Sequence, residues 1–261
     1  MSGPAPLAQR LVAQSTFEVR SLLSNGEQLL VSIILPIIAL VVLVTVRPAY
    51  ATELGSGSAG TVTDTVAGAA SLAVPGVLAL AVVSTAFTGQ AIVLAYERRY
   101  GVLRLLGTTP LGRSGLLISK GGAVLVVVTL QCAVLGGLGL ALGWRPVPVG
   151  IPAAVLVIVL GCAAFVALAA LLGGTLRAEA VLAFANLAWI VFLGCGLLFP
   201  LDVLPETLAS VLRLTPPGAL GEGLRVSLLG VDPVPLLPVV VLSVWTVAIG
   251  ALAAARLRWS D

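Results

Sequence analysis

Six long apolar runs, separated by shorter polar segments, dominate the chain. A helix needs about 20 apolar residues to cross the roughly 30 Å hydrocarbon core of a bilayer. Alternating segments of about ten residues, which are typical of a transmembrane β-barrel, do not occur. The pattern predicts an all-α polytopic membrane protein, with one transmembrane domain over residues 1–261 and about six spans: 28–46, 71–95, 116–142, 151–173, 180–199 and 234–254.

The composition agrees with this fold class. Hydrophobic residues make up 59% of the chain and charged residues only 10%, with a mean hydropathy of +1.15. Soluble domains carry about 25% charged residues. The chain is therefore expected to lie mostly within a membrane.

The distribution of Lys and Arg predicts the orientation, because these residues concentrate on the cytoplasmic side. With the N-terminus inside, 10 of the 14 basic residues fall on inner segments and 4 on outer ones. Both termini are then cytoplasmic, and the net charge of +3 is a signal of topology that does not indicate nucleic-acid binding. The inner set is Arg10, Arg20, Arg98, Arg99, Arg104, Arg113, Lys120, Arg177, Arg256 and Arg258.

A signal-peptidase site is one alternative for the first run, because Ala49-Tyr50-Ala51 has the A-x-A form. The run before it is longer than the 7–15 residues typical of a signal peptide, and acidic residues precede it. We expect this run to be a membrane span.

Residues 7–24 form an amphipathic pattern with helical spacing. The pattern predicts a helix that lies in the cytoplasmic interface or packs on the protein's own cytoplasmic face, and the two arrangements are compatible. The expected apolar face holds Ala8, Leu11, Val12, Ser15, Val19 and Leu22, and the expected outer face holds Arg10, Gln14, Glu18 and Ser21.

Two other segments differ from simple loops. Residues 96–110 are basic and amphipathic and lie between two apolar runs, so they predict a short helix at the membrane surface that is offered to a partner. Residues 200–230 are apolar but divided by prolines into pieces too short to span. Two short half-buried helices that dip in from the outer face fit this segment, with Pro205 at the first helical position of one of them.

Several classes of chemistry are excluded by residue types. The chain has no His, and its three cysteines lie inside predicted spans, where they are expected to fill apolar space rather than bind a metal. A GxxxxGK[ST] phosphate loop is missing, so the chain has no P-loop ATP site of its own. Because Asp, Glu and Arg are missing from the middle of every run, an ion-coupled carrier is disfavoured.

At this point the sequence resembles a family. Residues 97–111, ERRYGVLRLLGTTPL, are similar to the E-R-x-x-G-x-(apolar)-x-x-L-x-x-(T/S)-P-L loop of ABC type-2 transporter permeases. Residues 198–205, LFPLDVLP, resemble the family's entry into a re-entrant hairpin after span five, and 214–225 resemble its tail. The similarity extends over essentially the whole chain. Tyr100 departs from the charged residue that many relatives carry there.

The resemblance implies a mechanism. Two permease subunits form the pathway, and two separate ATPase subunits, which bind ATP and Mg²⁺, dock beneath; this chain binds no cofactor. The implied ATPase-coupling residues are Glu97, Arg98, Arg99, Val102, Arg104, Leu105 and Leu106. The implied re-entrant hairpin contains Pro200, Asp202, Pro205, Pro216 and Arg225. The family consists chiefly of exporters.

The same resemblance places spans one, two and five along the pathway, where the candidates are Ser84, Thr88, Asn186 and Trp189. Hydrogen bonds between packed helices are the alternative role for these polar groups. The weakly polar spans favour a hydrophobic or amphipathic cargo, such as a drug or lipid. An ATP-independent secondary carrier and a structural half of a heterodimeric permease remain alternatives. Abundant Ala, Val, Gly and Arg with one Lys suggest a GC-rich bacterium, whose cytoplasmic membrane would hold the protein.

Overall fold

The computed structural model describes residues 6–24, 26–53, 66–106, 112–198, 200–232 and 234–256, and all regular structure in these ranges is helical. Five helices are long and apolar enough to cross a membrane: Val66–Arg99, Ser114–Ala141, Pro148–Thr175, Ala178–Leu197 and Leu236–Arg256. The first predicted span lies in a further helix, of which Ser32–Thr45 is described as a shorter apolar stretch. The predicted all-α membrane fold is confirmed, with five of the expected spans.

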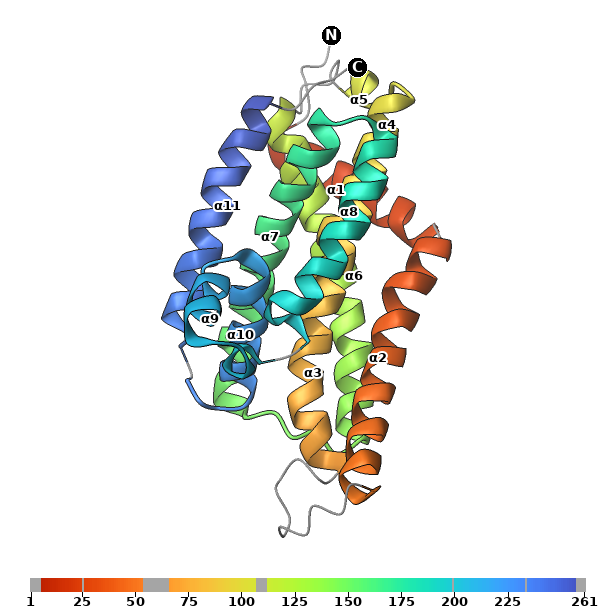
Figure 1. Ribbon diagram of the computed structural model, residues 1–261. Helices are drawn as coiled ribbons and strands as arrows, with labels where there is room; N and C mark the ends of the chain where they lie inside the picture. Colours follow the sequence, from red (N-terminus) through yellow and green to blue (C-terminus); the bar gives the residue numbers. More distant parts are fainter. Residues whose placement is uncertain are drawn as a thin grey trace.

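The long helices lie side by side in one bundle (Figure 1). The elements are α1 (Leu7–Ser24), α2 (Gly26–Glu53), α3 (Val66–Val83), η2 (Ser84–Gly89), α4 (Gln90–Arg99), α5 (Val102–Leu106), α6 (Gly112–Ala141), η3 (Pro148–Gly150), α7 (Ile151–Thr175), α8 (Ala178–Phe192), η4 (Leu193–Leu197), η5 (Leu201–Val203), α9 (Glu206–Arg213), α10 (Pro216–Leu228) and α11 (Leu236–Arg256).

The core lies around α3 and α7. Small residues allow close packing: an added Cβ at Gly173 of α7 would lie 2.6 Å from the carbonyl oxygen of Ala91. Phe87, Phe165 and Phe192 form an aromatic cluster with ring centroids 5.3–6.2 Å apart. The helices α8 and α11 instead expose large apolar side chains, as a helix facing lipid or another membrane subunit does.

The second predicted span is one continuous helix, Val66–Arg99, made of α3, η2 and α4. Its middle, η2, is a π-helical segment. Such segments are rare inside α-helices and occur frequently at functional sites, because the wider turn shifts the side chains that follow to a different face.

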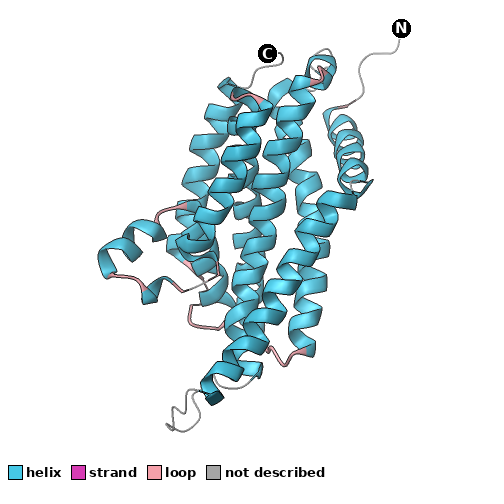
Figure 2. Ribbon diagram, turned by 45° about the vertical axis from the view of Figure 1, so that its right-hand side comes forward, coloured by secondary structure: helices cyan, strands magenta, loops and turns pink. Residues whose placement is uncertain are grey.

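The N-terminal helix α1 packs on the side of α6, outside the main bundle (Figure 2). The predicted faces of this helix were partly wrong. Glu18, expected on the outer face, is 3% exposed, whereas Val12, expected on the apolar face, is 66% exposed. The reason is a polar partner on α6, described below, that draws the Glu18 carboxylate inward.

Two short helices, α9 and α10, lie between α8 and α11, in the half of the molecule away from α5 (Figure 1). Pro205 is the N-cap residue of α9 rather than its first helical residue. In α9 only Ala209 is buried, whereas α10 is largely buried and contacts α3, α7 and α11. Thr215 caps α10 by accepting a hydrogen bond from the Gly218 N–H at 3.4 Å. The segment is therefore two helices, as expected, with unequal burial.

Candidate functional site

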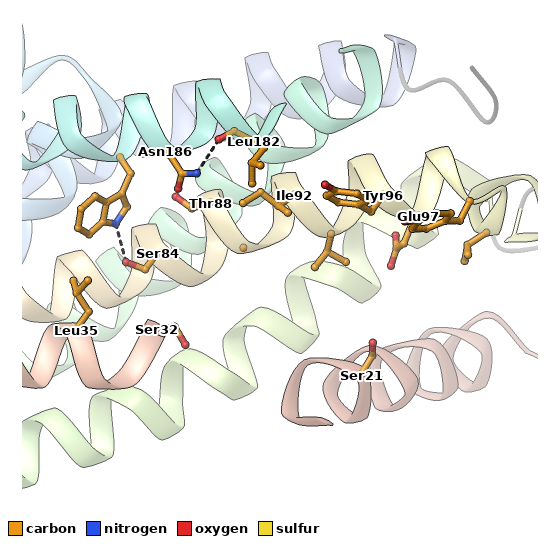
Figure 3. Close-up of a pocket in the computed structure, with 15 residues that line it drawn as sticks. Ser21, Ser32, Leu35, Ser84, Thr88, Ile92, Tyr96, Glu97, Leu182 and Asn186 are labelled. Carbon is orange, nitrogen blue, oxygen red and sulfur yellow. Dashed lines mark hydrogen bonds between the residues drawn. The ribbon is translucent and has the colours of Figure 1, made fainter. Parts of the chain in front are cut away.

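A cavity of about 810 Å³ lies between α2, the η2–α4 segment and α8, with α1 at one end (Figure 3). All four residues predicted to line a pathway also line this cavity: Ser84 and Thr88 from η2, and Asn186 and Trp189 from α8. Residues that are 100 positions apart in the sequence thus meet around one space.

The polar groups of the cavity differ in how they are satisfied. The Trp189 indole N–H donates to the Ser84 hydroxyl at 2.9 Å, and the Asn186 amide donates to the carbonyl of Leu182 at 2.9 Å (Figure 3). The Thr88 hydroxyl oxygen is buried and has no hydrogen-bond partner among the described residues. The Ser84 hydroxyl therefore takes part in a hydrogen bond between packed helices, which is the alternative role considered for these polar groups. The Thr88 hydroxyl makes no such bond among the described residues.

The cavity ends, on the side of α5, at a buried cluster of charges that we call the Lys120 triad: Glu18, Glu97 and Lys120. The ammonium of Lys120 lies 2.9 Å from Glu97 Oε2 and 3.0 Å from Glu18 Oε2. Lys120 and Glu18 are 2% and 4% exposed, and Glu97 is 19% exposed. The Gln14 amide donates to Glu18 Oε1 at 3.0 Å. The triad therefore joins α1, α4 and α6.

Glu18 and Lys120 were not predicted as site residues. One signal could have found them: Lys120 is the chain's sole lysine and lies near the start of an otherwise apolar run. A buried cation requires an anionic partner. The sequence did not show that Glu18, 102 positions away, supplies one.

Two of the residues expected to contact an ATPase turn inward instead. Glu97 belongs to the Lys120 triad, and Arg98 is 5% exposed and donates to the carbonyl oxygen of Leu176. The cause is helical geometry: consecutive residues of α4 point about 100° apart, so Arg99 faces outward where Arg98 faces inward. Arg99 forms an exposed ion pair with Glu179.

The remaining predicted coupling residues lie on α5, a five-residue helix at the end of the bundle (Figure 1). The chain reverses at Gly101, whose φ of 76° favours glycine. Leu103 is fully buried and anchors the helix, and Leu106 packs against the same cluster. Leu105 is 70% exposed, and Val102 and Arg104 are also exposed. The rest of the predicted 96–110 region, residues 107–110, lies outside the described residues.

Arg225 holds the predicted hairpin to the end of α8. Its guanidinium is 4% exposed and donates to the carbonyl oxygens of Gly196 at 2.8 Å and Leu197 at 2.6 Å. These carbonyls are freed where the helix breaks at Gly196, which has a φ of 94°. Burial lowers the pKa of Arg225, whereas nearby Glu222 and Asp202 act in the opposite direction.

The other predicted hairpin residues surround this contact. Asp202 is exposed and accepts a hydrogen bond from Arg213 at 2.7 Å, an ion pair that ties η5 to α9. Pro200 precedes η5 as its N-cap residue, and Pro216 begins α10 and is buried. The structure thus brings all five predicted hairpin residues into one region, with Arg225 as its buried polar centre.

These features define a multi-pass membrane protein whose helices line a cavity of drug-sized volume and present a short exposed helix at one end. The family model described as ABC-2 family transporter protein matches residues 49–256, and the chain belongs to this family. The comparison with curated proteins gives no match. The chain is therefore a permease of an ABC transporter, a class of membrane subunit that generally works with ATPase subunits.

Proposed function

We propose that the chain is the permease subunit of an ATP-driven exporter in the cytoplasmic membrane of a bacterium. In this proposal two ATPase subunits bind ATP and Mg²⁺ and dock on the α5 end of the bundle, which is cytoplasmic together with both termini. A second copy, or a homologous permease, completes the pathway. The cargo is hydrophobic or amphipathic, and it enters the cavity beside α8.

The observation that carries this proposal is the construction of α5. A five-residue helix is too short to be stable alone. It is held in place by the Gly101 carbonyl, which accepts hydrogen bonds from the Arg104 and Leu105 N–H groups, and by the buried Leu103. Such anchoring leaves the Arg104 and Leu105 side chains exposed on a rigid support. An exposed apolar side chain beside a cation suits a groove on a protein partner.

The connection from α5 to the cavity supports coupling between the two. The turn at Gly101 follows α4 directly, and α4 continues into η2, which carries Ser84 and Thr88. A force applied at α5 therefore acts on one continuous helix that lines the cavity. The Lys120 triad ties the same helix to α1 and α6. We infer that α4, α1 and α6 move together when the ATPases close.

A second permease subunit is supported by the exposed faces next to the cavity. α8 exposes Leu187 and Ile190, at 58% and 60%, and α2 exposes Ile38 at 56%. Both helices line the cavity, together with η2 and α4. A partner subunit seated on α2 and α8 would close it within the membrane.

Copurification tests the proposal. The chain would be isolated from its native membrane with a mild detergent and its soluble partners identified by mass spectrometry. We expect a stoichiometric ATPase subunit with a Walker A motif. Arg104→Glu should reduce the copurified ATPase at least tenfold, because an arginine at the centre of an interface contributes about 2 kcal/mol or more.

The matched control is Arg20→Glu, which reverses an exposed charge on α1 rather than on α5. This variant should keep the ATPase. Equal loss from both variants would show that general charge rather than the α5 contact holds the partner. Absence of any ATPase, under conditions that preserve other ABC complexes, would contradict the proposal.

Two alternatives make different predictions. A secondary carrier would transport without ATP. Of the buried ionisable groups of the Lys120 triad, Glu97 lies near the end of α4 and Lys120 in the first third of α6, rather than at the middle of these helices, which disfavours ion coupling. A structural half of a heterodimeric permease would copurify with a second, different permease. Transport that persists in ATP-depleted vesicles would support the first alternative over the exporter.

A further inference from the structure

We infer that the α5 end of the cavity binds the positively charged head group of an amphiphile, an amine or quaternary ammonium, whose apolar part extends along α4 and α8. The inference rests on the proposed function, because it assigns a cargo class to the proposed pathway. It is argued from the charges, the rings and the apolar wall of the cavity.

The charge of the cavity is negative at one end. Of the described residues that line it, Glu97 alone is charged. The Lys120 triad holds two carboxylates and one ammonium, so its formal charge is −1. Glu18 is 4% exposed and Glu97 is 19% exposed, so Glu97 is the carboxylate side chain of the triad that borders the cavity. Figure 3 shows the Glu97 carboxylate at this end of the cavity.

Two aromatic rings line the same end of the cavity as this carboxylate. Tyr96 and Tyr100 both line the cavity, and their rings stack with centroids 6.0 Å apart and an interplanar angle of 27°. A cation within about 6 Å of an aromatic face is attracted by the ring quadrupole. A carboxylate beside two tyrosine rings is the chemistry that recognises ammonium groups, whereas an anionic head group would be repelled by Glu97.

The wall next to this end is apolar. Ile92 and Val93 of α4 and Leu182 of α8 line it, and Leu35 of α2 lies further along (Figure 3). A volume of about 810 Å³ falls in the range of sites for drug-sized molecules. A cationic head followed by an apolar body therefore matches the cavity in this order.

A binding measurement with probes of equal chain length tests the inference. The full chain would be placed in nanodiscs of phosphatidylcholine, and binding of radiolabelled dodecyltrimethylammonium, dodecanol and dodecyl sulfate would be measured below their micellar concentrations. Empty nanodiscs correct for partition into lipid. We expect saturable binding of the cation, about tenfold tighter than that of dodecanol. The cation's advantage should fall as salt rises, because salt screens charge interactions.

Variants at Tyr100 separate ring chemistry from folding. Tyr100 is 73% exposed, so substitutions there should not unfold the protein. Tyr100→Leu should weaken cation binding about two- to fivefold, and Tyr100→Phe should leave it within about twofold, because the ring face remains. Phe17→Leu is the control, an exposed aromatic residue on α1 that does not line the cavity. Glu97→Gln should abolish the preference for the cation over dodecanol.

The source of the amine is decided by lipid composition. In nanodiscs that contain phosphatidylethanolamine, competition with the probe would identify a lipid amine as an occupant, and unchanged binding would identify a soluble amphiphile. Equal affinities for the cation and dodecanol, together with no effect of Tyr100→Leu, would overturn the inference. If the ATPase still copurifies in that case, the proposed function stands. If cation binding holds but no ATPase copurifies, the proposed function fails and the site stands.

Discussion

Replacing Lys120 with methionine removes the one ammonium that faces both carboxylates of the Lys120 triad. Lys120 is fully buried, and its Nζ lies 3.0 Å from Glu18 and 2.9 Å from Glu97. Methionine has a similar length and keeps most of the packing. The variant Lys120→Met therefore leaves two buried carboxylates near each other without their shared cation.

The expected cost follows from the burial of these groups. Breaking a buried ion pair by removing one partner destabilises a protein by about 3–5 kcal/mol, because a charge stays buried without compensation. For a chain of this size, each kcal/mol shifts the Tm by about 2–4 °C, so the Tm of Lys120→Met should fall by about 10 °C. Thermal unfolding of the purified protein in detergent, followed by the loss of monodisperse protein, measures this shift.

A compensated variant makes the reasoning testable. In Lys120→Met combined with Glu18→Gln and Glu97→Gln, no charge remains buried at this site, so most of the lost stability should return. Hydrogen exchange of α1 should rise in the single variant and recover in the triple variant, because the Lys120–Glu18 contact holds α1 to α6. If Lys120→Met unfolds at the wild-type temperature, or the triple variant is less stable than the single one, the reasoning is refuted.

The remaining predictions concern the end of α8 and the cavity. Arg225→Leu should lower the free energy of unfolding by about 3 kcal/mol or more, because two buried charge-assisted hydrogen bonds are lost. Arg213→Leu removes a partner from an exposed ion pair and should lower the free energy of unfolding by less than about 1 kcal/mol. Denaturant unfolding in detergent compares the two variants. Gly221→Ala should lower the free energy of unfolding by about 1–3 kcal/mol in the same assay, because its Cβ would lie 2.1 Å from a backbone carbonyl oxygen. Gly137→Ala is the control: an added Cβ there has nothing within 4 Å, so the free energy of unfolding should not change. Trp189→Phe should lower the free energy of unfolding by only about 0.6 kcal/mol, because one interhelical hydrogen bond is lost. The rate of cargo efflux from vesicles should change by more than this small loss of stability explains. A fall in stability with an unchanged efflux rate would favour a purely structural role.

The fold class was predictable because its cause is local in sequence. Runs of apolar residues long enough to cross a bilayer leave a helix as the natural structure, since the backbone must satisfy its own hydrogen bonds in lipid. Prolines likewise predicted the division of 200–230 into short helices, and the order of the motifs predicted the family that the match over residues 49–256 shows. The four pathway candidates line one cavity, and their role in a pathway stays a prediction.

The direction of individual side chains was decided only by the tertiary structure. The sequence pattern put Glu18 opposite the apolar face of its helix, and the family resemblance implied that Arg98 contacts an ATPase. Both side chains are buried, because Lys120 of α6 and the Leu176 carbonyl supply partners that are distant in the chain. The sequence by itself determined which segments are helical and apolar, since that depends on composition and local spacing. Which charges are paired, and which ones line the cavity, depends on contacts between segments that are close only after folding.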